Sequence, residues 1–244
     1  MGGFNTFIGW IAEPLAFALT KLYGVVGNYG LTLLIFTIIV KFCLYPLYAK
    51  QVKSMANMAK VQPKIKALQQ RYANDKETLN RKMMELYKEE KFNPAGGCLP
   101  MLIQMPIIFG LFALLRNPLA YISGEKMLLA IHESFLWIPD LSQPDPWILP
   151  LAAGITTFFS FTLTQKQSGA DDENNPGASM MKPMKYFFPV MIVWWGRSFP
   201  AGLTIYWFLS QVIQVFFSLH LNRVRRRIVD ANEPERRPDR KSVV

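Results

Sequence analysis

Apolar residues in this chain gather into long runs separated by polar segments, which is the pattern of a membrane protein. A helix that crosses the hydrocarbon core needs about 20 predominantly apolar residues. The last apolar stretch is too long for one such helix, and the turn from Arg197 to Gly202 divides it in two. The pattern therefore predicts an all-α integral membrane fold with five transmembrane helices, at residues 30–49, 96–116, 147–164, 183–197 and 199–221.

Residues 1–29 have a different pattern. Apolar side chains recur there every three or four positions and so share one face of a helix, although Glu13-Pro14 interrupts the run. The stripe consists of Phe4, Ile8, Ile11, Leu15, Leu19 and Leu22. We expect an amphipathic helix that lies in the membrane interface on the external side instead of spanning the bilayer.

Residues 50–95 are polar but keep a helical period on both sides of a turn at residues 73–76. This predicts two antiparallel helices with a narrow apolar seam, forming a cytoplasmic hairpin. One interpretation is a solvated link between two spans. Most connections need only about 4–6 residues, however, so the length favours a device that docks a partner.

The distribution of Lys and Arg predicts the orientation. These residues are concentrated in the hairpin and in the C-terminal tail, whereas the opposite side carries only Lys21, Arg116, Lys126 and Arg197. Basic loops face the cytoplasm, so the N-terminus is expected outside and the C-terminus inside. The remaining segments are predicted to be an external interfacial segment at 117–146, a flexible cytoplasmic loop at 165–182 and a basic cytoplasmic tail at 222–244.

The tail begins with a cluster of arginines directly after the fifth predicted span. Such juxtamembrane clusters bind anionic lipid headgroups, at about 1 kcal/mol per residue. Phosphates of ribosomal RNA would attract the same charges. Charge alone leaves both partners open.

Composition argues against catalysis. The chain is 51% hydrophobic with a formal charge of +10, and it has two cysteines and two histidines. Cys43 and Cys98 form no CxxC pair, and the predicted spans contain no Asp or Glu. No nucleophile–base pair or metal cluster can be assembled within a span, so we expect a protein that is not an enzyme and uses no cofactor or metal.

Lys41 is the exception within this pattern, because it lies near the middle of the first predicted span. A lysine at the bilayer centre costs about 2.5–3.5 kcal/mol on insertion scales. It has no acidic partner in any span, and snorkelling from mid-span is difficult. Its remaining options are a water-filled pocket, a carbonyl or hydroxyl oxygen, a lowered pKa or an external anion.

Polar residues in the other spans suggest a hydrated groove around Lys41. Thr37 lies one turn before it on the same helical face. Each polar residue alone is weak support, because such side chains commonly hydrogen-bond helices together. The candidate lining residues are Thr37, Gln104, Thr157, Ser160, Gln211 and Gln214.

Several motifs occur in a distinctive order. They are Tyr45-Pro46-Leu47, Gln62-Pro63-Lys64-Ile65, Asn93-Pro94-Ala95-Gly96-Gly97-Cys98-Leu99-Pro100, Phe135-Leu136-Trp137-Ile138-Pro139-Asp140-Leu141-Ser142, and Phe199-Pro200-Ala201-Gly202-Leu203 followed by Tyr206-Trp207. Over roughly residues 25–222 the chain resembles the YidC/Oxa/Alb family of membrane-protein insertases, in its compact bacterial form.

The resemblance implies a five-span core with a hydrophilic groove that is open to the cytoplasm and to lipid. It implies that Lys41, where most relatives have arginine, attracts the outward-going tail of a nascent membrane protein, with Tyr206 and Trp207 among the contacts to substrate. Lysine keeps the charge but lacks the bidentate fork of arginine. Phe161 and Gln211 also depart from the family pattern, which usually has Gln and Asn there.

The implied place of action is the bacterial plasma (inner) membrane. The implied partners are nascent membrane proteins, the ribosome through the tail and hairpin, and anionic lipids, with the Sec translocon and signal-recognition components as further candidates. Two alternatives stay open. One is an assembly chaperone that acts only with a translocon, and the other is a small-anion transporter, for which an inverted repeat is expected but none is visible.

Overall fold

The protein is all-helical in the computed structural model, which describes residues 2–90, 99–122, 125–168 and 176–231. Within these ranges the only pairing of strand type is an isolated bridge between Phe135 and Ile138. The elements in chain order are α1 (Gly2–Val26), α2 (Tyr29–Arg71), α3 (Lys76–Glu89), α4 (Leu99–Arg116), η2 (Pro118–Ala120), α5 (Glu125–Ala130), α6 (Ile148–Ser168), α7 (Pro176–Gly196) and α8 (Ala201–Ala231). The predicted all-α fold is confirmed.

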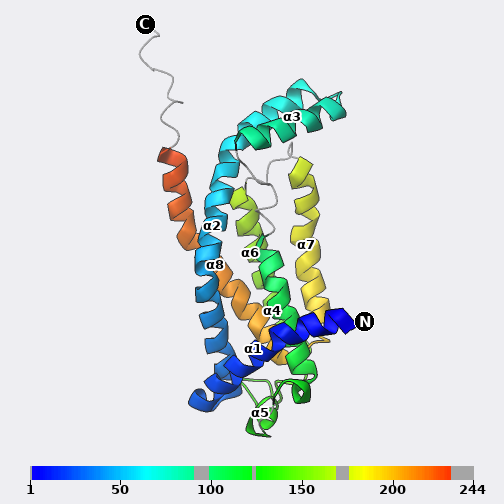
Figure 1. Cartoon of the computed structure of the whole chain (residues 1–244), viewed down its shortest axis with the longest axis vertical. Helices are drawn as coiled ribbons and strands as arrows, with labels where there is room; N and C mark the ends of the chain where they lie inside the picture. Colours follow the sequence, from blue (N-terminus) through cyan, green and yellow to red (C-terminus); the bar gives the residue numbers. More distant parts are fainter. Residues whose placement is uncertain (1, 91–98, 123–124, 169–175, 232–244) are drawn as a thin grey trace.

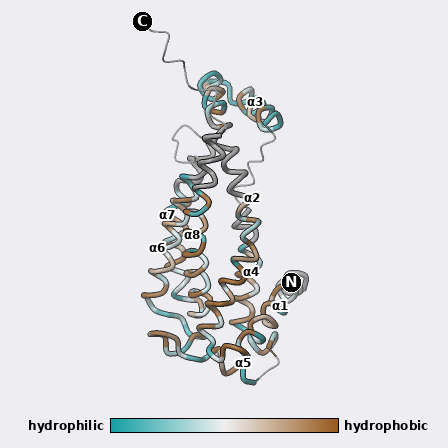
Figure 2. The backbone as a smooth tube through the Cα atoms, turned by 90° about the vertical axis from the view of Figure 1, so that its left-hand side faces the viewer, coloured by the Kyte–Doolittle hydropathy of each residue, from teal (hydrophilic) through white to brown (hydrophobic). Residues whose placement is uncertain are grey.

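A bundle of helices runs along the long axis of the molecule, and shorter or crossing helices lie at its ends (Figure 1). Helices α2, α4, α6, α7 and α8 form the bundle; α3 lies at one end, and α1 crosses the bundle near the other, where α5 also lies. The end with α3 is largely hydrophilic and the opposite part of the bundle largely hydrophobic (Figure 2). We call the α5 end the outer end, in keeping with the orientation expected from the basic residues.

Three helices are long and apolar enough to cross a membrane among the residues described: Tyr29–Lys50, Ile148–Lys166 and Ala201–Asn222. A shorter apolar helix covers Gln104–Arg116. Many large apolar side chains on the bundle are exposed, among them Ile39 and Phe42 of α2 and Phe216 of α8. Surfaces of this kind are stable in lipid, because the hydrocarbon then covers them.

Helix α2 is continuous over 43 residues, so it does not end at the expected limit of the first span near residue 50. At about 1.5 Å per residue it is about 65 Å long, roughly twice the thickness of the hydrocarbon core. It begins after Gly27, whose φ of 70° is left-handed, and after Asn28, whose side chain accepts a hydrogen bond from the Leu31 N–H group. The fall in hydropathy near residue 50 therefore indicates where α2 leaves the apolar part of the bundle, and not where the helix ends.

The second half of α2 packs against α3. The turn between them is closed by Asp75, whose carboxylate accepts from the backbone N–H of Thr78 at 3.0 Å. Val61, Ile65 and Leu86 are buried in a small apolar cluster separate from the main core. Positions spaced by three and four on each helix thus form the seam, as the periodicity indicates.

Helix α1 packs part of its predicted apolar stripe, at Ile11 and Leu15, against α4. A Cβ atom at Gly110 of α4 would lie 2.8 Å from Leu15 Cδ1 and 2.9 Å from Ile11 Cγ2, so the two helices approach closely only because position 110 is glycine. The outward face is also apolar, with Trp10 and Phe17 exposed. The stripe therefore docks α1 onto the bundle, and a second apolar face is left for lipid.

At the outer end, residues 133–147 hold the first turns of all three long apolar helices. The Glu133 carboxylate accepts hydrogen bonds from the Tyr23 hydroxyl and from the backbone N–H of Tyr29, the first residue of α2. The Asp145 carboxylate accepts from the N–H groups of Trp147 and Leu149 at the start of α6, at 3.0 and 3.1 Å, and from the Trp137 indole at 2.8 Å.

The start of α8 is held by backbone groups of the same segment. The N–H groups of Ala201 and Gly202 donate to the carbonyls of Gln143 and Leu141, at 2.9 and 3.0 Å. The start of a helix leaves N–H groups without intrahelical partners, and here one loop supplies acceptors at the starts of three helices. The loop thereby fixes how α2, α6 and α8 are placed relative to one another at this end.

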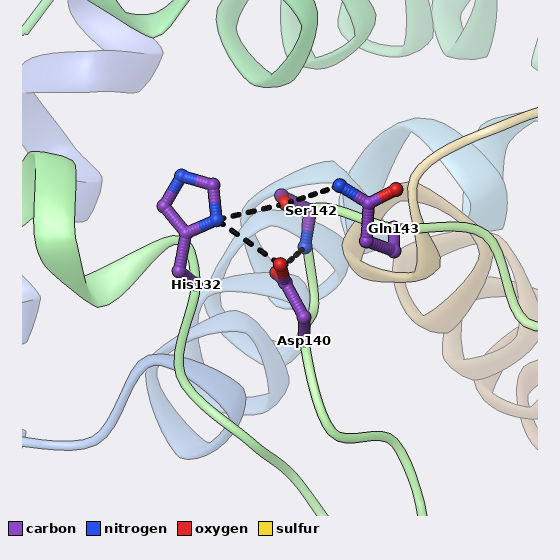
Figure 3. Close-up of polar contacts among 4 residues, drawn as sticks. All are labelled: His132, Asp140, Ser142 and Gln143. Carbon is purple, nitrogen blue, oxygen red and sulfur yellow. Dashed lines mark hydrogen bonds and ion pairs between the residues drawn. The ribbon is translucent and has the colours of Figure 1, made fainter.

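A smaller polar cluster orders the loop itself (Figure 3). The Asp140 carboxylate accepts from the Ser142 N–H at 2.8 Å and lies 3.1 Å from His132 Nδ1. The Ser142 hydroxyl lies 3.0 Å from the same ring nitrogen. In a catalytic triad the acid and the nucleophile contact different nitrogens of the histidine. Because both contacts here are to Nδ1, the cluster is a loop-ordering contact and not a triad.

Candidate functional site

Lys41 lies inside the bundle, and its side chain is only 3% exposed. Its ammonium donates to the hydroxyl of Tyr48 at 3.1 Å and to Oε1 of Gln104 at 2.9 Å. The ammonium also lies 5.4 Å from the centroid of the Tyr48 ring. Of the options that the sequence leaves for Lys41, the structure has hydroxyl and carbonyl oxygens as its partners, and both are neutral.

Gln104 of α4 joins Lys41 to α8. Its amide nitrogen donates to the Tyr206 hydroxyl at 2.6 Å, while its amide oxygen faces the ammonium. This orientation is required, because a lysine ammonium has only donors and would otherwise meet the Gln104 NH₂ group. Tyr206 is fully buried. The chain of contacts from Lys41 through Gln104 to Tyr206 therefore links α2, α4 and α8 at one level of the bundle.

Tyr48 is a member of this site that the sequence did not suggest. It follows Lys41 by seven residues, which is close to two turns, so it lies on the same face of α2. It is 5% exposed, and its ring lies 6.2 Å from that of Phe217 in α8. Tyr45 also contacts Phe217, at 5.0 Å. The seven-residue spacing from Lys41 was the available signal.

A second polar contact joins α6 to α8. The indole N–H of Trp207 donates to the Thr157 hydroxyl oxygen at 3.0 Å, and that hydroxyl donates to the Ala153 carbonyl at 2.6 Å. Successive residues of a helix point about 100° apart, so Tyr206 and Trp207 face different neighbours. Tyr206 meets α4, and Trp207 meets α6.

The other predicted residues are not brought into contact with Lys41. Thr37 is fully buried, and its hydroxyl donates to the Leu33 carbonyl at 2.7 Å within α2. Ser160 is buried on α6, and Gln211 and Gln214 are half-buried on α8. Of the candidate set, the described contacts therefore connect two groups: Lys41 with Gln104 and Tyr206, and Thr157 with Trp207.

No carboxylate in the described part of the chain forms an ion pair with Lys41. The five apolar stretches contain no Asp or Glu. Among the residues that the structure describes, no group of three or more His, Cys, Asp or Glu side chains is placed to hold a metal ion. What the site offers chemically is a buried cation with neutral hydrogen-bond partners.

Fold and site together define an all-helical membrane protein with a cation enclosed between its helices. A model of the family described as "60Kd inner membrane protein" matches residues 21–228. The chain is 43% identical over 206 residues to a protein of Fusobacterium nucleatum subsp. nucleatum named membrane protein insertase YidC, covering 84% of this chain and 91% of that one. The chain belongs to the family of YidC-type insertases.

Longer relatives match over the same region. Proteins of the same name from Francisella philomiragia subsp. philomiragia and Geobacter sp. (strain M21) are 39% and 36% identical, over 85% and 88% of this chain. The chain spans only 35% and 38% of their lengths. These relatives and the apolar helices indicate a protein of the inner membrane.

A solved structure has a similar fold. A crystal structure described as an active YidC insertase with its first transmembrane domain resolved matches with a TM-score of 0.59 and 29% identity, covering 84% of this chain and 45% of that one. The resemblance expected from the sequence motifs is thus confirmed at the level of the family.

Proposed function

We propose that this protein inserts nascent membrane proteins into the inner membrane and helps them fold, and that Lys41 attracts the tail of the substrate that must cross. The observation that carries the proposal is the uncompensated charge: Lys41 is buried among neutral oxygens, and the spans around it contain no carboxylate. A buried cation of this kind interacts more strongly with an incoming anion than a surface cation does, because water does not screen it.

The proposed topology has five spans, with the N-terminus outside and the C-terminus in the cytoplasm. Helices α4 and α7 complete the set begun by the three long apolar helices. The contacts of residues 133–147 with the starts of α2, α6 and α8 support a closed outer end. A hydrophilic groove between the helices would then open toward the cytoplasm and the lipid, with Thr37, Thr157, Ser160, Trp207, Gln211 and Gln214 as candidate lining.

The physical task is to move a short polar tail through hydrocarbon. Lys41 would pair with acidic groups on the tail part of the way across and so shorten the unfavourable path. The membrane potential, positive outside, would then favour their exit by about 2.3 kcal/mol per charge per 100 mV. Apolar parts of the substrate would pass sideways into lipid. No covalent step and no cofactor is involved.

The cytoplasmic segments are proposed to receive the substrate. The α2–α3 hairpin carries an exposed Met84, and methionine surfaces adapt to varied apolar partners. The basic tail would hold the ribosome or anionic headgroups. The Sec translocon and signal-recognition components would be partners only for substrates that the protein does not insert by itself.

Reconstitution tests the proposal. Purified protein in liposomes is given a substrate with one span and a short acidic outward tail, and protease protection of the tail measures insertion. We expect insertion well above that of empty liposomes, retained by Lys41→Arg and reduced to the level of empty liposomes by Lys41→Ala. Lys21→Ala serves as the matched control, because Lys21 is an exposed cation on α1.

Failure of the wild type to insert the substrate without a translocon would favour the alternative of an assembly chaperone. Full insertion by Lys41→Ala would remove the charge from the mechanism. Chloride or phosphate flux through the same liposomes that disappears in Lys41→Ala would instead favour a small-anion transporter.

A further inference from the structure

Lys41 is enclosed in this structure, yet the proposed function requires a substrate to reach it. The two acceptors that enclose it differ in how firmly they are held. Gln104 is fixed from the far side by its 2.6 Å hydrogen bond to the fully buried Tyr206. The hydroxyl of Tyr48 makes the longer contact, at 3.1 Å, and its ring leans on Phe217. Tyr48 is therefore the partner that can be displaced at the smaller cost.

The position of Tyr48 along α2 matters as much as its bond. It lies seven residues, about 10 Å, closer to the α3 end than Lys41 does. Side chains of a helix normally lean toward its N-terminus, so the Tyr48 side chain leans toward Lys41, and its hydroxyl accepts a hydrogen bond from the ammonium. The Tyr48 backbone thus lies on the side of Lys41 from which a cytoplasmic substrate would come, and its hydroxyl contacts the ammonium.

Resting on the proposed function, we propose that Tyr48 is a gate: it keeps Lys41 occluded when no substrate is present, and an acidic tail reaches Lys41 only by displacing the Tyr48 hydroxyl. The exchange is favourable, because a carboxylate adds to the hydrogen bond the attraction between opposite charges, which is stronger in a buried site than in water. It is also reversible, because the tyrosine returns when the tail has left. The gate makes Tyr48 a positioning residue that selects substrates by their charge.

Phe217 is the other half of the gate. Its ring lies within 5.0–6.2 Å of the rings of Phe42, Tyr45 and Tyr48, so α8 supports the aromatic face of α2 at this level. Removing the Phe217 ring should let Tyr48 swing away without any change to its hydroxyl. The closed position then depends on two independent contacts, and each can be removed separately.

The occlusion can be measured without any insertion assay. In lipid nanodiscs, the Lys41 amine is acetylated with acetic anhydride, and the labelled peptide is quantified by mass spectrometry from pH 7 to 10. The plateau rate at high pH reports access to the amine separately from its loss of a proton. Tyr48→Phe removes only the hydroxyl. It should raise the plateau rate about fivefold, which corresponds to losing one hydrogen bond between neutral groups, because the amine is deprotonated at the plateau.

The matched control is Tyr45→Phe, the same chemical change three residues away on a ring that packs on the same Phe217. It should leave the labelling of Lys41 within about twofold of the wild-type rate. Phe217→Leu should raise the rate as Tyr48→Phe does. An unchanged rate in both Tyr48→Phe and Phe217→Leu, or an equal rise in Tyr45→Phe, would overturn the gate.

Insertion of paired substrates connects the gate with function. One substrate has an acidic tail, and the other has the same tail with each Asp changed to Asn. Tyr48→Phe should increase the insertion of the acidic substrate and leave that of the neutral one unchanged. Equal changes for both tails would overturn the selective role. If labelling opens as expected while wild-type protein inserts neither substrate, occlusion of Lys41 stands and the proposed insertase function fails.

Discussion

Charged side chains at the outer end and at the level of Lys41 differ in the partners that they contact. At the outer end, Glu133 and Asp145 accept hydrogen bonds from N–H groups that begin α2 and α6, where the helix dipole also favours negative charge. At the inner site the cation Lys41 meets only a hydroxyl and an amide oxygen. The outer carboxylates accept hydrogen bonds from backbone N–H groups that have no other acceptor in their helix. The inner ammonium donates to neutral oxygens, which a carboxylate could replace.

The difference suggests separate duties for the two regions. A matched carboxylate at a helix start fixes geometry, because breaking it leaves buried donors without acceptors. A cation with neutral partners contributes little to holding the helices in place, because its interaction with each partner is weaker than an interaction with an anion would be. Stability should therefore depend on the outer carboxylates, and substrate handling on the inner cation. Mutations that separate stability from insertion can test this division.

The largest effect is expected for Asp145→Ala. Asp145 is buried and accepts three hydrogen bonds, two from the start of α6 and one from the Trp137 indole. Each donor left without a partner costs about 1–3 kcal/mol, so the free energy of unfolding should fall by about 3–5 kcal/mol. Unfolding by denaturant in mixed micelles measures the change, and insertion should fall only as far as the folded fraction does.

Asp145→Asn is the control for charge. Its amide oxygen can still accept from the two backbone N–H groups, so it should recover about half of the loss. A wild-type free energy of unfolding in Asp145→Ala would contradict the assignment of stability to the outer end. So would a folded Asp145→Ala protein that inserts nothing.

The regular features of this molecule followed from sequence, whereas the contacts between distant residues did not. Hydropathy and period predicted the helices and the hairpin seam of Ile65 and Leu86, because both depend on neighbours within a few residues. The first span and the hairpin belong to one helix, because falling hydropathy at residue 50 does not stop a helix that retains its backbone hydrogen bonds.

The site was predictable in part for the same reason. Lys41 was evident because a charge in an apolar run is costly wherever it packs. Its bond to Gln104 joins residues 63 positions apart, and that of Tyr29 to Glu133 joins residues 104 apart, so no local pattern reveals either pair. Tyr48 was predictable from its seven-residue spacing, but a tyrosine within an apolar run does not stand out as a polar residue as Gln104 does.

A middle-sized effect is expected for Tyr23→Phe. The Tyr23 hydroxyl donates to the Glu133 carboxylate at the outer end, and this hydrogen bond, together with partial burial and the charge of Glu133, raises the pKa of the phenol above its usual value of 10.0. Loss of one hydrogen bond to a charged group at a partly exposed site should lower the free energy of unfolding by about 1–2 kcal/mol.

The pH dependence gives a second measurement of the same bond. Since the folded pKa of Tyr23 is raised, its contribution to stability is complete below about pH 10 and is lost as the pH rises through the raised value. The wild type should therefore lose more thermal stability between pH 9 and 11 than Tyr23→Phe does. Parallel pH profiles would show that the bond does not stabilise the junction of α1 and α2.

The smallest effect on stability is expected for Lys41→Met, although it changes the most unusual charge of the chain. Methionine keeps an unbranched side chain of similar length and removes the cation. Two neutral oxygens, on Tyr48 and Gln104, lose a donor at a cost of about 1–3 kcal/mol each, but the penalty of several kcal/mol for burying the ammonium disappears. The free energy of unfolding should stay within about 1 kcal/mol of the wild-type value, while insertion of acidic tails is lost. A loss of stability as large as that of Asp145→Ala would mean that Lys41 is a structural charge like those of the outer end, and the contrast between the two regions would then be wrong.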